Sequence, residues 1–198
     1  MPRRGGVTAA ELKAILATDP AYQKMRAEKD AALQERRRIL VDDASPLAED
    51  LRLAGWDVKT AWDLVNTATP YPSAIPVLLR HLGEPYLDRN REGIARALAV
   101  RDAAYAWPIL KAAYELAPVD SGAKSGLAVA LSATASDETI TELAILAKDR
   151  ANGSSRLLLL DGLRRSRSSV ARDALTELAD DPDLAKEIAS WKSRKTNR

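Results

Sequence analysis

An eight-residue pattern that returns at a nearly constant spacing constrains this chain more than any other feature. Arg91-Glu-Gly-Ile-Ala-Arg-Ala-Leu98 is followed 33 residues on (91 to 124) by Lys124-Ser-Gly-Leu-Ala-Val-Ala-Leu131. A further 32 residues on (124 to 156) comes Arg156-Leu-Leu-Leu-Leu-Asp-Gly-Leu163. This period is too long for one helix and suits a helix, a turn and a second helix. The pattern therefore predicts a stack of helical hairpins.

The copies also align outside the octet, and their shared apolar positions predict the core. These positions are Ile94, Leu127 and Leu159; Leu98, Leu131 and Leu163; Leu110, Leu143 and Leu175; and Ala113, Leu146 and Leu178. Spacings of three and four place such anchors on one face of a helix. Gly93 and Gly126 coincide as well, and because a helical glycine costs about 1 kcal/mol relative to alanine, we expect close helix packing there.

Composition supports an all-α protein. The chain of 198 residues is rich in alanine and leucine, the strongest helix formers, and has no phenylalanine. It also has no cysteine, which excludes disulfides, thiolate metal sites and a cysteine nucleophile. No apolar run approaches the roughly 18 residues of a membrane helix, and the start lacks a hydrophobic signal core. We therefore expect a cytoplasmic protein that does not bind membranes.

The order of the segments predicts three parts: a charged helical N-terminal extension (1–45), a repeat region (46–192) and a basic disordered tail (193–198). In the extension, Thr8 and Glu11 form a capping box, and Asp19-Pro20 starts a long charged helix. The apolar stripe of that helix is thin, so it is the expected place for self-association. In the repeat region, we expect Asp88 to cap the helix that begins at Arg89, and Gly83 to end a helix in the left-handed conformation.

These residues resemble the HEAT-repeat family, and in particular short bacterial HEAT-like repeats. The resemblance rests on the three octets, with a base, small residues and Ala-Leu in the second helix, and covers about residues 46–191. It implies a right-handed α-α superhelix, a solenoid of antiparallel helix pairs. Such motifs specify a fold rather than an activity. The tetratricopeptide pattern and the ankyrin Thr-Pro-Leu-His motif are missing.

Catalytic chemistry finds no support in the sequence. His81 is the only histidine, and its place in the last turn of a helix is explained by hydrogen bonds to free carbonyls. Without cysteine, one histidine cannot build a nitrogen–sulfur zinc site. The adjacent carboxylates Asp180-Asp181 read as a helix end. We therefore predict no enzymatic activity, no metal and no cofactor.

The bases Arg91, Lys124 and Arg156 form the most suggestive set, because they recur near the start of successive helices. Two interpretations stay open: a cationic row for a partner, or a structural role for each base. Positions expected to face outward do not repeat in charge, since Arg96 aligns with Val129 and Asp161. Trp62 and Trp107 lie among apolar residues and are expected in the core. The residues predicted to bind a partner on the concave wall and its rim are Arg89, Arg96, Lys124, Arg164, Arg165, Trp56, Tyr71 and Tyr86.

Two classes of function fit these features. The first is a protein-interaction scaffold whose concave wall of second helices holds a protein partner. The second is nucleic-acid binding through the basic stretch 150–172, in its enzymatic form a relative of HEAT-like DNA glycosylases. The net charge of only +2 and the lack of a matching acid–tryptophan set count against the second. A small-molecule role like that of bilin lyases rests on analogy alone.

Overall fold

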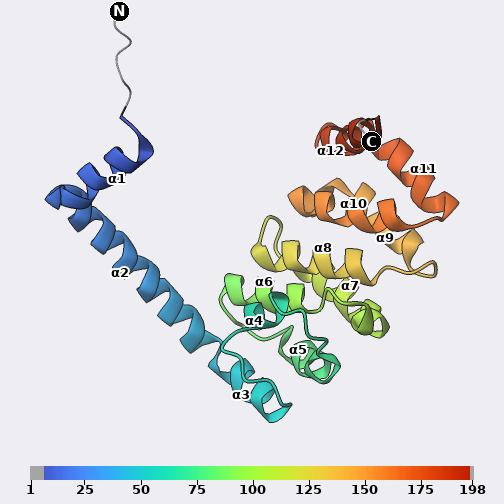
Figure 1. The fold of residues 1–198 in the computed structure, drawn as a ribbon. Helices are drawn as coiled ribbons and strands as arrows, with labels where there is room; N and C mark the ends of the chain where they lie inside the picture. Colours follow the sequence, from blue (N-terminus) through green and yellow to red (C-terminus); the bar gives the residue numbers. More distant parts are fainter. Residues whose placement is uncertain (1–6, 197–198) are drawn as a thin grey trace, which may run out of the picture. The chain divides into compact units, whose positions relative to one another are not determined.

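The computed structural model describes residues 7–196, with side chains as far as Trp191, and these residues form helices and loops without a strand. The chain divides into two units, residues 1–42 and 43–198 (Figure 1). The expectation of an all-α protein is confirmed for the part described. The predicted disordered tail (193–198) falls partly inside helix α12, and its last two residues lie outside the described residues.

The first unit consists of two helices, α1 (Ala9–Thr18) and α2 (Pro20–Asp43). The predicted capping box is present: the Glu11 amide donates to Thr8 Oγ1 at 3.3 Å, and the Thr8 amide donates to Glu11 Oε2 at 2.8 Å. Asp19 starts α2 by accepting a hydrogen bond from the Ala21 amide at 2.9 Å. Neither helix buries a residue. The described residues of this unit are linked by local caps and by exposed ion pairs such as that of Arg38 with Glu35 at 2.7 Å, and not by a core.

The second unit contains ten α-helices and three short 3₁₀ turns among the described residues. Its elements are α3 (Ser45–Leu53), α4 (Ala61–Val65), η1 (Pro72–Ala74), α5 (Ile75–His81), α6 (Asp88–Ala97), η2 (Arg101–Ala106), α7 (Trp107–Leu116), α8 (Gly122–Thr134), α9 (Ile140–Lys148), η3 (Arg150–Ser155), α10 (Arg156–Arg165), α11 (Ser169–Leu178) and α12 (Ala185–Thr196). The segment 101–116 begins as η2 and becomes α-helical only at Trp107. Pro108 lacks an amide donor and is tolerated in a first turn, so the α-helix starts beside it.

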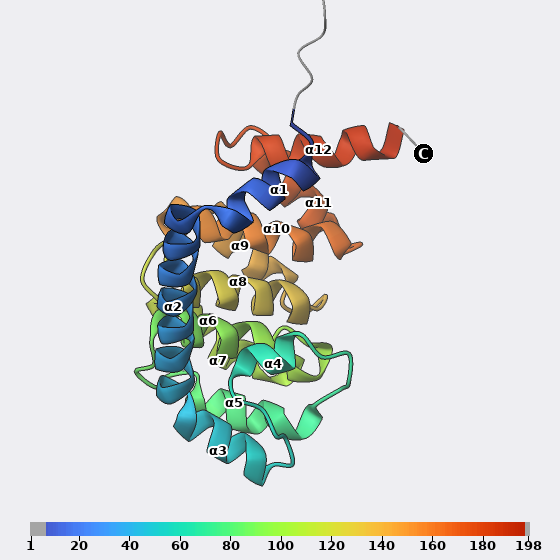
Figure 2. The same cartoon turned by 60° about the vertical axis from the view of Figure 1, so that its left-hand side comes forward.

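Within this unit, helices α4, α6, α8 and α10 pack side by side as one row (Figures 1 and 2). On one side of this row, α7 packs against α8 and α9 packs against α10. The three octets lie on α6, α8 and α10, so sequence repeats are also neighbours in space. We call these four helices the repeat row.

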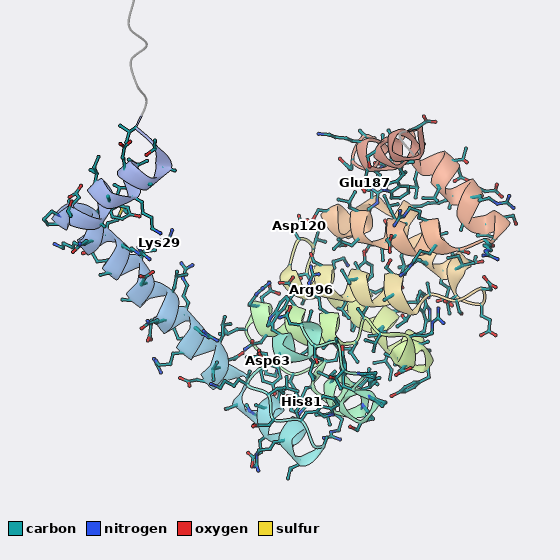
Figure 3. All side chains as sticks on the ribbon, viewed as in Figure 1. Lys29, Asp63, His81, Arg96, Asp120 and Glu187 are labelled. Carbon is teal, nitrogen blue, oxygen red and sulfur yellow. The ribbon has the colours of Figure 1, made fainter. Side chains whose placement is uncertain are left out.

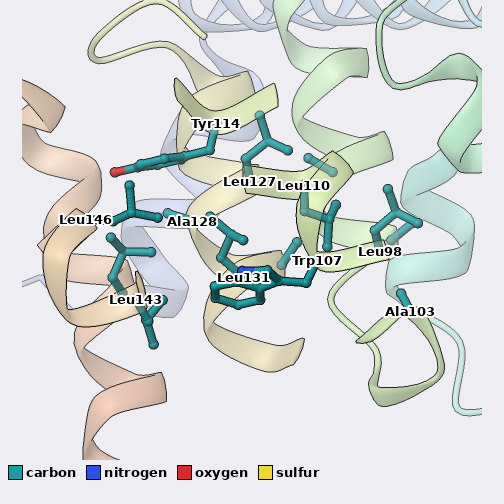
Figure 4. Packing of buried hydrophobic residues seen from close by; sticks show 14 of the residues in the cluster. Leu98, Ala103, Trp107, Leu110, Tyr114, Leu127, Ala128, Leu131, Leu143 and Leu146 are labelled. Carbon is teal, nitrogen blue, oxygen red and sulfur yellow. The ribbon is translucent and has the colours of Figure 1, made fainter. Parts of the chain in front are cut away.

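Most of the predicted anchors lie in the hydrophobic core (Figure 4). Ile94, Leu127 and Leu159, together with Leu98, Leu131 and Leu163, are at most 3% exposed. Leu110, Leu143, Leu146 and Leu178 are buried too, while Ala113 and Leu175 are half-buried. Each helix of the repeat row thus buries its apolar face between its neighbours, as the spacing predicted.

Glycines set how closely helices of the repeat row approach. A Cβ on Gly126 would lie 2.7 Å from the Glu92 carbonyl oxygen and 2.9 Å from the Ala95 Cβ on α6. A Cβ on Gly93 would lie 2.6 Å from the indole nitrogen of Trp62, which packs from α4. Such distances leave no room for a side chain. The packing reason expected for the coincident glycines is therefore confirmed.

Candidate partner-binding face

Two of the three repeated bases are structural. Lys124 is 2% exposed, and its Nζ donates to the Tyr114 carbonyl at 2.8 Å. Arg156 is 1% exposed, and its Nε donates to the Ala147 carbonyl at 2.8 Å. Both acceptors lie in the last turn of the preceding helix, where carbonyls lack helical partners and a cation is favoured. Lys124 was predicted to touch a partner, but the structure places its ammonium in the interior, where burial lowers its pKa.

Arg156 also forms a buried ion pair that sequence reasoning missed. Its guanidinium donates to Asp181 Oδ2 at 2.7 Å, and Asp181 is 7% exposed. Hydrogen bonding by Arg156 holds the pKa of the Asp181 carboxyl below its usual value. Asp181 also lies at the start of the turn that leads into α12, where its Oδ1 accepts from the Asp183 amide at 3.0 Å. It thus joins the last helices to the repeat row as well.

Aspartates link successive hairpins in a way that the sequence did not predict. Asp88 lies inside α6 and caps the next helix of the row, because its carboxylate accepts from the amides of Gly122 at 2.7 Å and Ala123 at 3.0 Å. The expectation that Asp88 caps its own helix is wrong. Asp120 accepts in the same manner from the Ser154 hydroxyl at 2.7 Å. These hydrogen bonds between neighbouring hairpins therefore fix how each hairpin is aligned with the next.

The solvent face of the repeat row carries the strongest binding-site candidates. We call it the row face and define it by residues that align in the repeats and are exposed or half-buried: Glu92, Ser125 and Leu157; Arg96, Val129 and Asp161; and Val100, Ala133 and Arg165. The central helix α8 contributes only short side chains to it. Longer charged side chains stand on α6 and α10. Short side chains along α8 are thus flanked by longer charged ones, among them Arg96 on α6 (Figure 3), and we call this strip of α8 the trough.

The predicted arginines of α6 border this trough, and each is already paired. Glu92 accepts from Arg89 at 2.7 Å and from Arg96 at 2.8 Å. The Arg89 guanidinium lies 3.7 Å from the ring centroid of Trp62, at cation–π distance. Trp62 was expected in the core, but it is half-buried. One face of its ring is covered by the exposed side chain of Arg89 instead of by core residues. Trp107 is buried as expected.

The predicted arginines of α10 border the opposite side. Arg164 lies 2.5 Å and Arg165 lies 3.4 Å from Asp161, and Arg165 also donates to the Ser132 carbonyl at 2.6 Å. The Arg164 guanidinium lies 5.2 Å from the ring of Trp191. Acidic and basic side chains thus alternate on the row face, which is not uniformly cationic.

The predicted aromatic residues do not gather on one rim. Tyr71 is 7% exposed and donates to the Ala97 carbonyl at 2.9 Å, so it is a core residue. Trp56 packs edge-on against it and donates to Ser73 Oγ at 2.9 Å. Tyr86 lies apart from both, stacked on His81. These residues therefore do not form a joint binding surface.

Two hollows open where α6, α8 and α10 end. The first, of 490 Å³, is lined by residues of α4 and of the α4–η1 loop, by Arg96 and Val100, and by Val129 of α8. The second, of 570 Å³, is lined by Ala133 of α8, Arg165 of α10, Asp137 and Arg167. Arg101 lines both. The hollows thus continue the trough past the C-terminal ends of the helices.

His81 belongs to a hydrogen-bonded chain that sequence reasoning also missed. Its Nε2 lies 2.9 Å from Asp50 Oδ2, and its Nδ1 lies 2.6 Å from the Tyr86 hydroxyl. Arg80 reaches the same Asp50 oxygen at 3.1 Å. The expected bonds from His81 to helix-end carbonyls are replaced by these contacts. Burial and the nearby Glu84 and Asp43 raise the pKa of Tyr86. Because Asp50 lies on α3 and His81 on α5, their hydrogen bond braces α3 against α5.

This brace predicts a pH dependence of stability. Hydrogen bonds from His81 and Arg80 lower the pKa of Asp50 in the folded state. The stabilisation is present above the unfolded pKa, about 3.9, and is lost as pH falls through the folded pKa. We expect Asp50→Asn to destabilise the protein at neutral pH and the gap to wild type to narrow below about pH 4. Urea unfolding across this range measures it; a gap that stays constant would show that the Asp50 charge contributes nothing.

The described residues hold no group of histidine, aspartate and glutamate side chains able to bind a metal ion. None of the helices within residues 7–196 is long and apolar enough to cross a membrane. Comparison of the chain with protein-family models, with curated proteins and with solved structures finds no match.

Proposed function

We propose that residues 43–191 form a HEAT-like α-solenoid that works as a non-catalytic scaffold and holds a protein partner on the row face. The trough along α8 carries this proposal. Ser125, Val129 and Ala133 are short, while the flanking charges of α6 and α10 stand on either side. A shallow surface with an apolar centre and a rim of paired charges suits a protein surface, since interfaces combine an apolar core with a polar rim.

Nucleic-acid binding, including a glycosylase-like activity, receives less support from the same contacts. Within the basic stretch, Arg150 pairs with Asp181 at 3.3 Å, and Arg156 is buried. Arg164 and Arg165 both meet Asp161. A phosphate backbone needs a series of uncompensated cations, whereas these four arginines share carboxylates of the protein. Within the stretch, only Arg167 and Arg172 form no ion pair with a described residue.

Photo-crosslinking from the row face tests the proposal. A benzophenone side chain at position 129 in the full chain should capture a protein in cells that express this chain. The same group at position 145, where Ile145 on α9 is 61% exposed, serves as the control. A protein adduct obtained from 129 and absent from 145 supports the proposal. Adducts that nuclease removes would favour the nucleic-acid alternative instead.

A further inference from the structure

The two hollows at the ends of α6, α8 and α10 differ in chemistry. The first presents an apolar surface that includes Val65, Pro70 and Val100. The second presents the arginines Arg101 and Arg167. An occupant that spans both would therefore need an apolar part and a polar part of opposite charge.

The arginines of the second hollow differ in the contacts that they already make within the protein. Arg165 is held by the Ser132 carbonyl and by Asp161. Arg101 and Arg167 are exposed, and neither forms an ion pair with another described residue within 4.0 Å. The single carboxylate lining this hollow is Asp137. The second hollow thus has an excess of positive charge, and two of its guanidinium groups are available to an anion.

We propose that these hollows bind a short extended segment of a partner protein, in which an apolar side chain is followed by acidic residues. The apolar side chain enters the first hollow against Val100 and Val129. The carboxylates reach Arg101 and Arg167, whose planar guanidinium groups fit carboxylates in a bidentate manner. This inference rests on the proposed scaffold function and adds the chemical class of the segment that it recognises.

A nucleic acid fits the same surface less well. Its backbone would bring a phosphate to every part of the groove, yet Asp102 lines the first hollow and Asp137 lines the second. The side chains of Val65, Pro70 and Val100 in the first hollow offer phosphates no hydrogen-bond donor, although Arg96, Arg101 and two threonines also line it. An apolar–acidic peptide places its negative charge only where Arg101 and Arg167 stand.

Selection from a random peptide library displayed on phage, with the full-length chain as bait, tests this inference. We expect enrichment of peptides in which an apolar residue is followed by aspartate or glutamate. The double variant Arg101→Glu, Arg167→Glu should weaken binding of the selected peptides by at least about tenfold, the loss of one charge-assisted contact or more. Arg172→Glu, a single charge reversal at an exposed residue of α11, should leave it unchanged.

The inference would be overturned by no enrichment, by enrichment of sequences without acidic residues, or by binding that the double variant leaves intact. Duplex DNA that competes with the selected peptides and loses affinity in the same variant would overturn it too. Circular dichroism and urea unfolding confirm that the double variant is folded, which its exposed positions lead us to expect. If the selection fails while position 129 still crosslinks to a protein, this inference fails and the scaffold function stands.

Discussion

Replacing Arg156 by methionine is expected to lower the free energy of unfolding by about 3 kcal/mol. Arg156 is 1% exposed and donates both to the Ala147 carbonyl and to Asp181. Methionine fills much of the space but leaves Asp181, 7% exposed, with only the surface residue Arg150 as a cationic partner. Removing one member of a buried pair is costly because the other charge stays desolvated. Urea unfolding at neutral pH measures the loss.

A matched variant separates this effect from the loss of any surface arginine. Arg164→Met removes an exposed ion pair with Asp161 and should change stability by about 1 kcal/mol or less. If Arg156→Met were as mild as Arg164→Met, the repeated base would not be a structural element. That result would favour the alternative interpretation, in which Arg91, Lys124 and Arg156 form a cationic row that binds a partner.

Gly126→Ala should destabilise the protein by about 1–2 kcal/mol, although alanine is the better helix former. Overpacking a core costs about 1–3 kcal/mol, whereas the gain in helix propensity is at most about 1 kcal/mol. The added Cβ would lie 2.7 Å from the Glu92 carbonyl oxygen, a backbone atom that cannot move without shifting α6. Thermal or urea unfolding gives the difference.

Gly83→Ala is the control for this substitution. A Cβ there would meet nothing within 4 Å, so we expect a change within about 0.5 kcal/mol. Gly83 was predicted to adopt the left-handed conformation, but the positive-φ glycines among the described residues are Gly55 and Gly153. The prediction for Gly83 is therefore wrong. Gly126→Ala without a penalty would contradict the close approach of α6 and α8.

The periodicity of apolar residues predicted the helices and the core, because it reflects side-chain packing along one helix face and between neighbouring repeats. Ile94, Leu127 and Leu159 could be found from spacing alone, since each is one turn from another anchor. The caps at Thr8 and Asp19 were also predictable, because their partners are two or three residues away. Gly126 could be assigned a packing role because it repeats the position of Gly93.

Contacts between hairpins were not predictable in the same way. Asp88 caps a helix that starts 34 residues later (88 to 122), and Asp50 meets His81 across 31 residues (50 to 81). Sequence alone does not say which loop or helix faces such a carboxylate. For the same reason, the prediction that Lys124 lies on the binding face is wrong. Its ammonium group instead donates to a carbonyl at the end of the preceding helix, α7. By contrast, the alignment of Arg96, Val129 and Asp161 did identify positions that share one partly exposed face.

The most direct test of the central claim, that the row face holds a protein partner, is photo-crosslinking from position 129 in the full chain. The account predicts adducts that protease removes and nuclease leaves intact, at a yield well above that from position 145 on α9. Equal yields from both positions, or adducts made only of nucleic acid, would contradict it.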